Sequence, residues 1–102
     1  MKIIQRTIMK ILPGKIAEAT ELLEKQAAVA SRLGGPRWTC YRRFSGGGDN
    51  MHTLVFRADW DSLSVMEATL EKASADPEMQ ELMAKWETIL ESQELELYTP
   101  LA

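Results

Sequence analysis

The hydrophobic pattern of this chain changes several times between a two-residue and a 3.6-residue period, and this change limits the possible folds more than any other feature. Four segments are rich in β-favouring side chains and alternate at least in part, which predicts strands at residues 2–11, 37–44, 51–59 and 94–99. Two stretches repeat apolar side chains every three or four positions, which predicts helices at 15–33 and between 61 and 90. The order of elements is therefore β-α-β-β-α-β.

This order predicts an α+β fold, the ferredoxin-like sandwich. Right-handed crossovers place both helical segments on one face of a four-stranded antiparallel sheet and leave the other face open. The length of 102 residues suits one domain that spans residues 1–102.

Glycine, proline and aspartate mark the ends of the predicted helices. Gly34-Gly35-Pro36 ends the first helix, because glycine accepts the left-handed conformation and proline cannot continue a helix. Asp61 is expected to cap the second helix, and Asp76-Pro77 to start a further one. The glycine-rich segment 45–50 predicts a hairpin turn. The first helix is expected to bury Ile16, Ala19, Leu23, Ala27, Ala30 and Leu33.

Charge and composition argue against several classes of protein. Twelve basic and 15 acidic residues give a net charge of −3, and the basic residues form no run, which argues against nucleic-acid binding. No segment approaches the ~20 apolar residues of a membrane span, and no secretory signal opens the chain. The single Cys40 cannot form an internal disulfide, so we expect a reducing, cytoplasmic location.

The predicted sheet has one core face and one mixed face. Leu54, Phe56 and Ala58 mark the core face of the third strand. Apolar and polar side chains are expected together on the opposite face: Met9, Tyr41, Val55 and Tyr98 beside Gln5, Thr7, Arg43, Arg57 and Glu96. A soluble monomer rarely leaves such a patch bare, so we expect a homodimer through this face, with the remaining polar groups lining an internal cavity.

Three short motifs lie at the ends of the predicted strands and helices. The first strand runs into Leu12-Pro13-Gly14-Lys15, residues 56–63 read Phe-Arg-Ala-Asp-Trp-Asp-Ser-Leu, and Asp76-Pro77-Glu78-Met79 precedes Trp86. Together they resemble the dimeric α+β barrel superfamily, with its NIPSNAP-like and antibiotic-biosynthesis-monooxygenase-like members. The resemblance spans nearly the whole chain and implies a homodimeric barrel. The superfamily includes haem-degrading and quinone-forming monooxygenases, cyclases, isomerases and members with no known activity.

The resemblance does not extend to the haem-degrading site. Haem-degrading members use an Asn on the first strand, a Trp in the second helical region and a His further along. This chain has Gln5 near the Asn position, Trp60 ahead of the helix, and no His after residue 52. We therefore do not expect haem degradation, and we expect no bound cofactor.

Single side chains offer several candidate roles, each with a structural alternative. His52 is either a general base or a solvated strand-end residue, and Cys40 is either a nucleophile or a small buried hydrophobe. One His and one Cys do not make a metal site, so none is expected. Arg57 either pairs with Glu96 or binds a ligand oxygen.

The main functional hypothesis is a small-molecule cavity between helices and sheet that binds or converts an apolar or aromatic molecule. The candidate pocket residues are Gln5, Thr7, Met9, Tyr41, Arg43, His52, Val55, Arg57, Trp86 and Tyr98. One alternative is a non-catalytic interaction module whose mixed face serves only dimerisation. The other is a cofactor-independent monooxygenase, which rests on analogy of fold.

Overall fold

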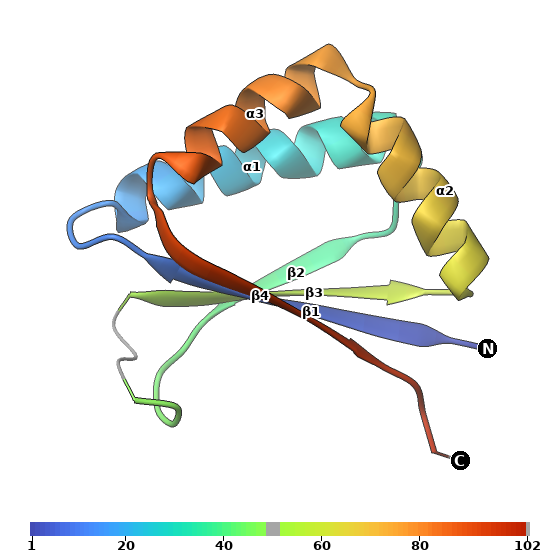
Figure 1. Ribbon diagram of the computed structural model, residues 1–102, viewed down its shortest axis with the longest axis horizontal. Helices are drawn as coiled ribbons and strands as arrows, with labels where there is room; N and C mark the ends of the chain where they lie inside the picture. The colour runs from blue at the N-terminus through green and yellow to red at the C-terminus, as the bar shows by residue number, and fades with distance from the viewer. Residues whose placement is uncertain (49–51, 102) are drawn as a thin grey trace.

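The computed structural model describes residues 1–48 and 52–101 and contains one sheet beneath a layer of helices (Figure 1). In chain order the elements are β1 (Ile3–Ile11), α1 (Ile16–Arg32), β2 (Trp38–Arg42), β3 (Thr53–Trp60), α2 (Leu63–Ser74), α3 (Pro77–Glu87) and β4 (Leu90–Tyr98). The strands pair antiparallel in the order β2-β3-β1-β4, and all helices lie on the same side of the sheet. The predicted α+β, ferredoxin-like fold is confirmed.

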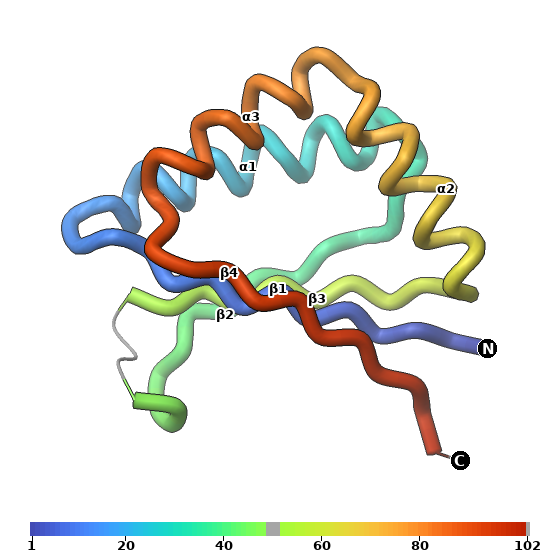
Figure 2. Tube along the Cα trace, in the orientation of Figure 1, coloured from blue at the N-terminus to red at the C-terminus, as the bar shows by residue number. Residues whose placement is uncertain are grey.

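The second helical region consists of two helices joined by a bend (Figure 2). α2 is capped by Ser62, whose side chain accepts the Val65 backbone N–H at 3.2 Å, so the predicted cap at Asp61 is wrong. The cause is that β3 continues to Trp60 and delays the start of the helix. α3 begins as predicted, with Asp76 accepting the Met79 N–H at 3.0 Å and proline in the first turn.

The packed face of α1 is wider than the predicted stripe. Ala19 is buried as predicted, and Ile16, Leu23 and Leu33 are partly buried against the core, whereas the predicted Ala27 is exposed. The packed face also includes Leu22, Gln26 and Val29, which follow the three- and four-residue steps of a helix from Ala19.

The register of β1 decides which side chains face the helices. Ile3, Gln5, Thr7 and Met9 pair with Trp60, Ala58, Phe56 and Leu54 of β3, and all of these side chains are buried beneath the helices. The prediction that Gln5, Thr7 and Met9 lie on the open face is therefore wrong. Isoleucines occupy both faces of β1, and a one-residue choice moves every side chain to the other face.

The open face carries apolar side chains between paired charges. Tyr41, Val55 and Ile8 form one row across β2, β3 and β1. In the next row Arg57 is the direct partner of Arg6, whose neighbour on β4 is Glu96. Because Arg6 stands between them, the predicted Arg57–Glu96 pair does not form. Arg57 Nε instead contacts Asp59 Oδ1 at 3.0 Å, and Arg6 Nε lies 3.8 Å from Glu96 Oε1.

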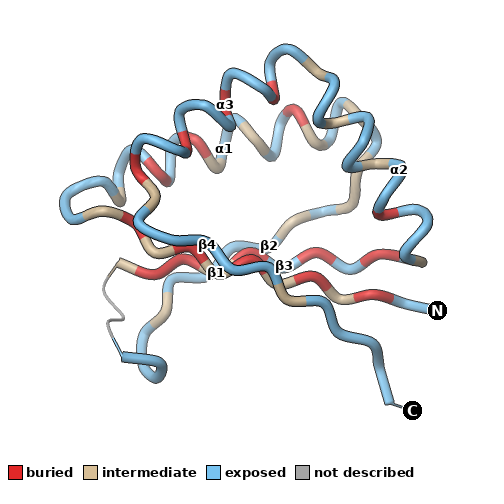
Figure 3. Tube along the Cα trace, in the orientation of Figure 1, coloured by how far each residue is buried: buried red, intermediate tan, exposed pale blue. Residues whose placement is uncertain are grey.

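The edge strand β4 is exposed along most of its length (Figure 3). It begins at Leu90, four residues before the predicted start, directly after α3. Its helix-side leucines, Leu95 and Leu97, are 53% and 44% exposed, because the helices do not extend over this edge.

At the other edge of the sheet, the turn after β2 uses Gly46, Gly47 and Gly48 at positive φ, a conformation that other residues rarely adopt. Residues 49–51 of the predicted turn and strand lie outside the described residues.

In the described ranges, no helix is long and apolar enough to cross a membrane.

Replacement of Asp76 by alanine is expected to lower the melting temperature by several degrees at neutral pH. The Arg32 guanidinium at 2.9 Å, and then the Met79 N–H, lower the pKa of the Asp76 carboxyl. Its stabilising effect is therefore complete above the usual pKa of about 3.9 and is lost as the pH falls through the lowered native value. Thermal unfolding from pH 7 to pH 2 measures this change.

Asp61→Ala is the matched control, because Asp61 is exposed and does not cap α2. An equal loss of melting temperature in both variants, or a loss that persists unchanged at low pH, would contradict the role given to Asp76.

Candidate ligand-binding cavity

A cavity of about 250 Å³ lies between the helices and the sheet. Every helix and every strand contributes to its wall, together with Gly35 and Pro36 after α1. The exposed residues of the wall are Leu70, Ser74, Met83 and Gln93, so the cavity opens between α2, α3 and β4. Its volume is just below the roughly 300–1,000 Å³ of drug-sized ligand sites.

Four aromatic side chains form a continuous wall inside the cavity. The rings of Trp60 and Trp38 are 6.3 Å apart, those of Trp38 and Phe56 are 6.1 Å apart, and those of Phe56 and Trp86 are 6.1 Å apart. Each pair meets edge to face, the arrangement favoured by the ring quadrupoles. We call this row, from Trp60 to Trp86, the aromatic wall. Because neighbouring rings are nearly perpendicular, it offers a ligand both ring faces and ring edges.

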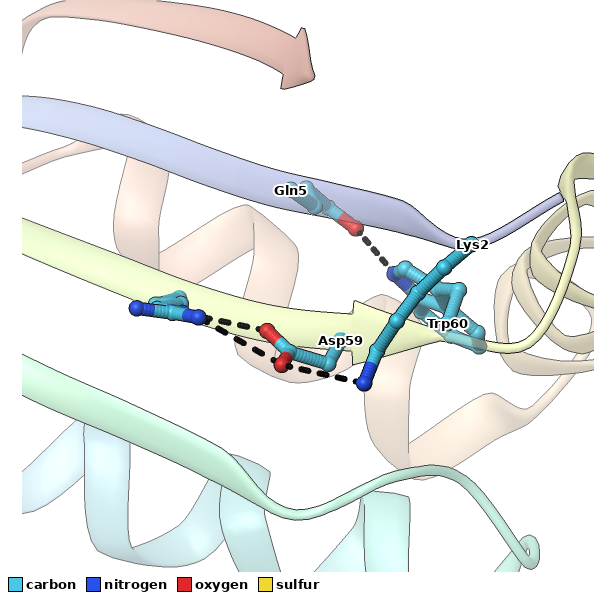
Figure 4. Close-up of polar contacts among 5 residues, drawn as sticks. Lys2, Gln5, Asp59 and Trp60 are labelled. Carbon is cyan, nitrogen blue, oxygen red and sulfur yellow. Dashed lines mark hydrogen bonds and ion pairs between the residues drawn. The ribbon is translucent and has the colours of Figure 1, made fainter. Parts of the chain in front are cut away.

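At one end of the aromatic wall, Trp60 binds the side chain of Gln5 (Figure 4). The indole Nε1–H donates to Gln5 Oε1 at 2.9 Å, and Gln5 Nε2 donates to Thr7 Oγ1 at 3.3 Å. Gln5 and Thr7 are each only 6% exposed. These hydrogen bonds offset the cost of placing an amide and a hydroxyl inside the core.

The other end repeats this arrangement. The Trp86 indole Nε1–H donates to Gln26 Oε1 at 2.8 Å, which joins α3 to α1 above the sheet. Gln26 is half-buried and lines the cavity. The aromatic wall therefore ends at a glutamine amide on both sides.

No ionisable side chain lines the cavity among the residues that the structure describes. Acid–base catalysis requires a titratable group within hydrogen-bond reach of the substrate. The cavity instead offers amides, hydroxyls, indoles and apolar groups, a composition suited to binding an uncharged molecule.

Four of the residues predicted for the pocket line the cavity: Gln5, Thr7, Met9 and Trp86. The other six, Tyr41, Arg43, His52, Val55, Arg57 and Tyr98, lie outside it. Tyr41, Val55, Arg57 and Tyr98 are on the open face of the sheet, separated from the cavity by the sheet itself.

The charged candidates on the open face are engaged by neighbouring side chains. Asp59 binds Arg57 and also lies 3.9 Å from Lys2 Nζ (Figure 4). Its hydrogen bond with Arg57 lowers the pKa of the Asp59 carboxyl. The Tyr98 hydroxyl donates to Glu96 Oε1 at 2.6 Å, which raises the pKa of this phenol.

The remaining reactive candidates also lie away from the cavity. Arg43 Nη1 is directed to the Gly47 carbonyl at 3.5 Å. Cys40 is exposed on edge strand β2, so the alternative of a small buried hydrophobe is wrong. Partial desolvation raises the pKa of its thiol, which keeps it protonated at neutral pH. His52 is half-buried, with no hydrogen-bond partner for Nδ1 among the described residues.

Gln26 and Trp60 belong to the cavity but were not predicted there. Gln26 lies four residues after Leu22 and three before Val29, so the helical period alone could have placed it on the packed face. Trp60 continues the alternation of Leu54, Phe56 and Ala58 and could have been assigned to the core face in the same way.

The described part of the chain contains no group of three or more His, Cys, Asp or Glu side chains that could hold a metal ion.

Comparison with solved structures shows the same fold in several proteins. An uncharacterised NIPSNAP domain protein from Burkholderia xenovorans is 26% identical, with a TM-score of 0.82 over 100% of this chain and 96% of its own. A NIPSNAP family protein from Agrobacterium tumefaciens is 20% identical, with a TM-score of 0.78 over 97% of this chain and 85% of its own. The chain has a NIPSNAP-like fold.

This confirms the resemblance seen in the sequence. SnoaB, a cofactor-independent oxygenase from Streptomyces nogalater, has the same fold at 20% identity, with a TM-score of 0.74 over 99% of this chain and 94% of its own. No family model and no curated protein matches the sequence. The function of this NIPSNAP-like chain therefore has to be argued from its own cavity.

Replacement of Trp60 by phenylalanine is expected to destabilise the protein by about 1–3 kcal/mol, because it leaves the buried Gln5 oxygen without a donor. Urea unfolding measures the free energy of unfolding. The same replacement in a Gln5→Leu background is expected to cost less, because the oxygen is then absent. An equal cost in both backgrounds would show that the Trp60–Gln5 bond contributes nothing.

Proposed function

We propose that the protein binds a small, flat, mainly apolar molecule in the cavity between helices and sheet. The observation that carries this proposal is the aromatic wall, which ends at polar amides. No charged side chain lines the cavity among the described residues. Binding sites of this kind combine a mostly apolar lining with a few placed polar groups. The exposed Leu70 and Met83 at the mouth would allow entry.

We propose further that the protein acts as a homodimer through the open face of the sheet. The row of Tyr41, Val55 and Ile8 is not covered by any helix. Four of the charges beside this row are paired within the chain, as Arg6–Glu96 and Arg57–Asp59, and Glu94, the β4 neighbour of Ile8, lies exposed on the edge strand. A second copy could therefore cover the centre of the face without leaving these four charges unpaired, which would be costly.

Cofactor-independent oxygenation is a second candidate function. It is favoured by the fold shared with SnoaB, which is described as a cofactor-independent oxygenase. Because the described cavity residues include no base, the substrate would have to supply its own reactivity. Oxygen consumption in the presence of a bound phenol would support this candidate.

Ala73→Phe is expected to weaken ligand binding, because Ala73 lines the cavity and a phenyl ring at this position fills part of its volume. Fluorene, a planar hydrocarbon, is a suitable probe, and its affinity can be measured by titration calorimetry. We expect a loss of at least tenfold.

Ala68→Phe is the matched control, because Ala68 is exposed on the same helix and does not line the cavity. Unchanged fluorene affinity in Ala73→Phe would contradict binding in the cavity. Failure of the wild-type protein to bind fluorene would contradict the proposed function and favour a non-catalytic interaction module.

Val55→Glu is expected to convert the dimer to a monomer, because it places a charge in the centre of the apolar row. Light scattering coupled to size-exclusion chromatography measures the mass. Ala84→Glu adds the same charge at an exposed position of α3 and should leave the dimer intact. A wild-type monomer, or a dimer that persists in Val55→Glu, would exclude this interface.

A further inference from the structure

We propose that the cavity selects ligands with an uncharged carbonyl oxygen, because two indoles hold the oxygens of the Gln5 and Gln26 amides and leave their N–H groups for a ligand. This inference rests on the proposed binding function and adds the chemical class of the ligand. Trp60 and Trp86 are the positioning residues, since they determine which end of each amide the ligand meets.

The Gln5 end offers two donors. An indole N–H can only donate, so the Gln5 atom at 2.9 Å from Trp60 Nε1 must be the oxygen. The amide nitrogen then faces Thr7 and uses one hydrogen on its hydroxyl oxygen. The second Gln5 hydrogen and the Thr7 hydroxyl hydrogen have no acceptor among the described side chains. Gln5 Nε2 and Thr7 Oγ1 are partners of each other, and each keeps one hydrogen that a ligand oxygen could accept.

The Gln26 end follows the same logic. Trp86 Nε1 lies 2.8 Å from Gln26 Oε1, so the amide nitrogen of Gln26 is the group left for a ligand. Because Trp60 and Trp86 are the two ends of the aromatic wall, one glutamine amide lies at each end of the wall.

The absence of ionisable lining residues in the described structure narrows the ligand class further. A carboxylate or phosphate would enter the cavity without a cation to pair with, which is unfavourable. An aliphatic amine, which is protonated at neutral pH, would enter as a cation with no carboxylate among the described lining residues to pair with. A neutral aromatic or alicyclic ketone satisfies the exposed N–H and O–H groups and retains flat apolar surface for the aromatic wall.

The test compares two probes of nearly equal shape, 9-fluorenone and fluorene, which differ by a carbonyl in place of a methylene group. Titration calorimetry gives the ratio of their dissociation constants in each variant. In the wild-type protein we expect fluorenone to bind about tenfold more tightly than fluorene. In Gln5→Leu we expect this preference to fall about 5- to 10-fold while fluorene still binds.

Trp60→Phe separates positioning from packing. Without the indole N–H the Gln5 amide can rotate and present its oxygen, so the preference for fluorenone is expected to fall although Gln5 is still present. A purely structural role of Trp60 would weaken both probes equally and leave the ratio unchanged. Ala84→Leu, at an exposed α3 position outside the cavity, is the control and should leave both affinities unchanged.

Two results would overturn the inference, and they are distinguishable. If the wild-type protein binds both probes equally, or if the ratio is the same in Gln5→Leu and Trp60→Phe as in the wild type, the donor arrangement does not select the ligand, and the proposed binding function survives. If neither probe binds the wild-type protein, the proposed binding function fails, and the inference fails with it.

Discussion

The pairing register of β1 is the constraint on which the rest of the structure depends. β1 pairs with both β3 and β4, so its pleat decides which side chains of three strands lie under the helices. This register places Gln5 and Thr7 in the core, where an unpaired amide or hydroxyl is costly. Trp60, directed into the same layer, supplies the donor that Gln5 requires. An apolar residue at position 5 would pack without the Trp60–Gln5 bond. Packing alone therefore does not explain a glutamine at this position, and a binding role does.

The same register separates the two faces of the sheet into two different surfaces. The helix side combines the aromatic wall with amides and hydroxyls, and no charge lines the described cavity. The open side combines an apolar row with ion pairs closed within the chain. The proposed ligand binding and the proposed self-association therefore use opposite faces of the sheet.

Much of the fold could be predicted from the sequence, because the change of hydrophobic period and the punctuation by glycine and proline are local signals. The Asp76-Pro77 helix start was clear, since cap and first-turn proline coincide. The face of β1 was not predictable in the same way, because Ile3 and Ile4 are adjacent and Ile8 and Met9 are adjacent, so both faces look apolar. The choice of the wrong face also affects the predicted pocket. It places Gln5, Thr7 and Met9 on the open face of the sheet, whereas the structure places them on the helix side. The sheet therefore separates them from Tyr41, Val55 and Arg57. Which of two polar residues faces a cavity depends on strand pairing, and strand pairing is a long-range property.

The fold itself does not decide the chemistry, since NIPSNAP domain proteins and a cofactor-independent oxygenase share it. The central claim is that the cavity between helices and sheet receives a flat apolar molecule. The methyl NMR signals of the methionines test it directly, because Met9, Met79 and Met83 line the cavity and Met1 is exposed outside it. On addition of fluorene we predict shifts of the Met9, Met79 and Met83 signals and an unchanged Met1 signal. No shift of the three cavity methionines at saturating fluorene would contradict the account.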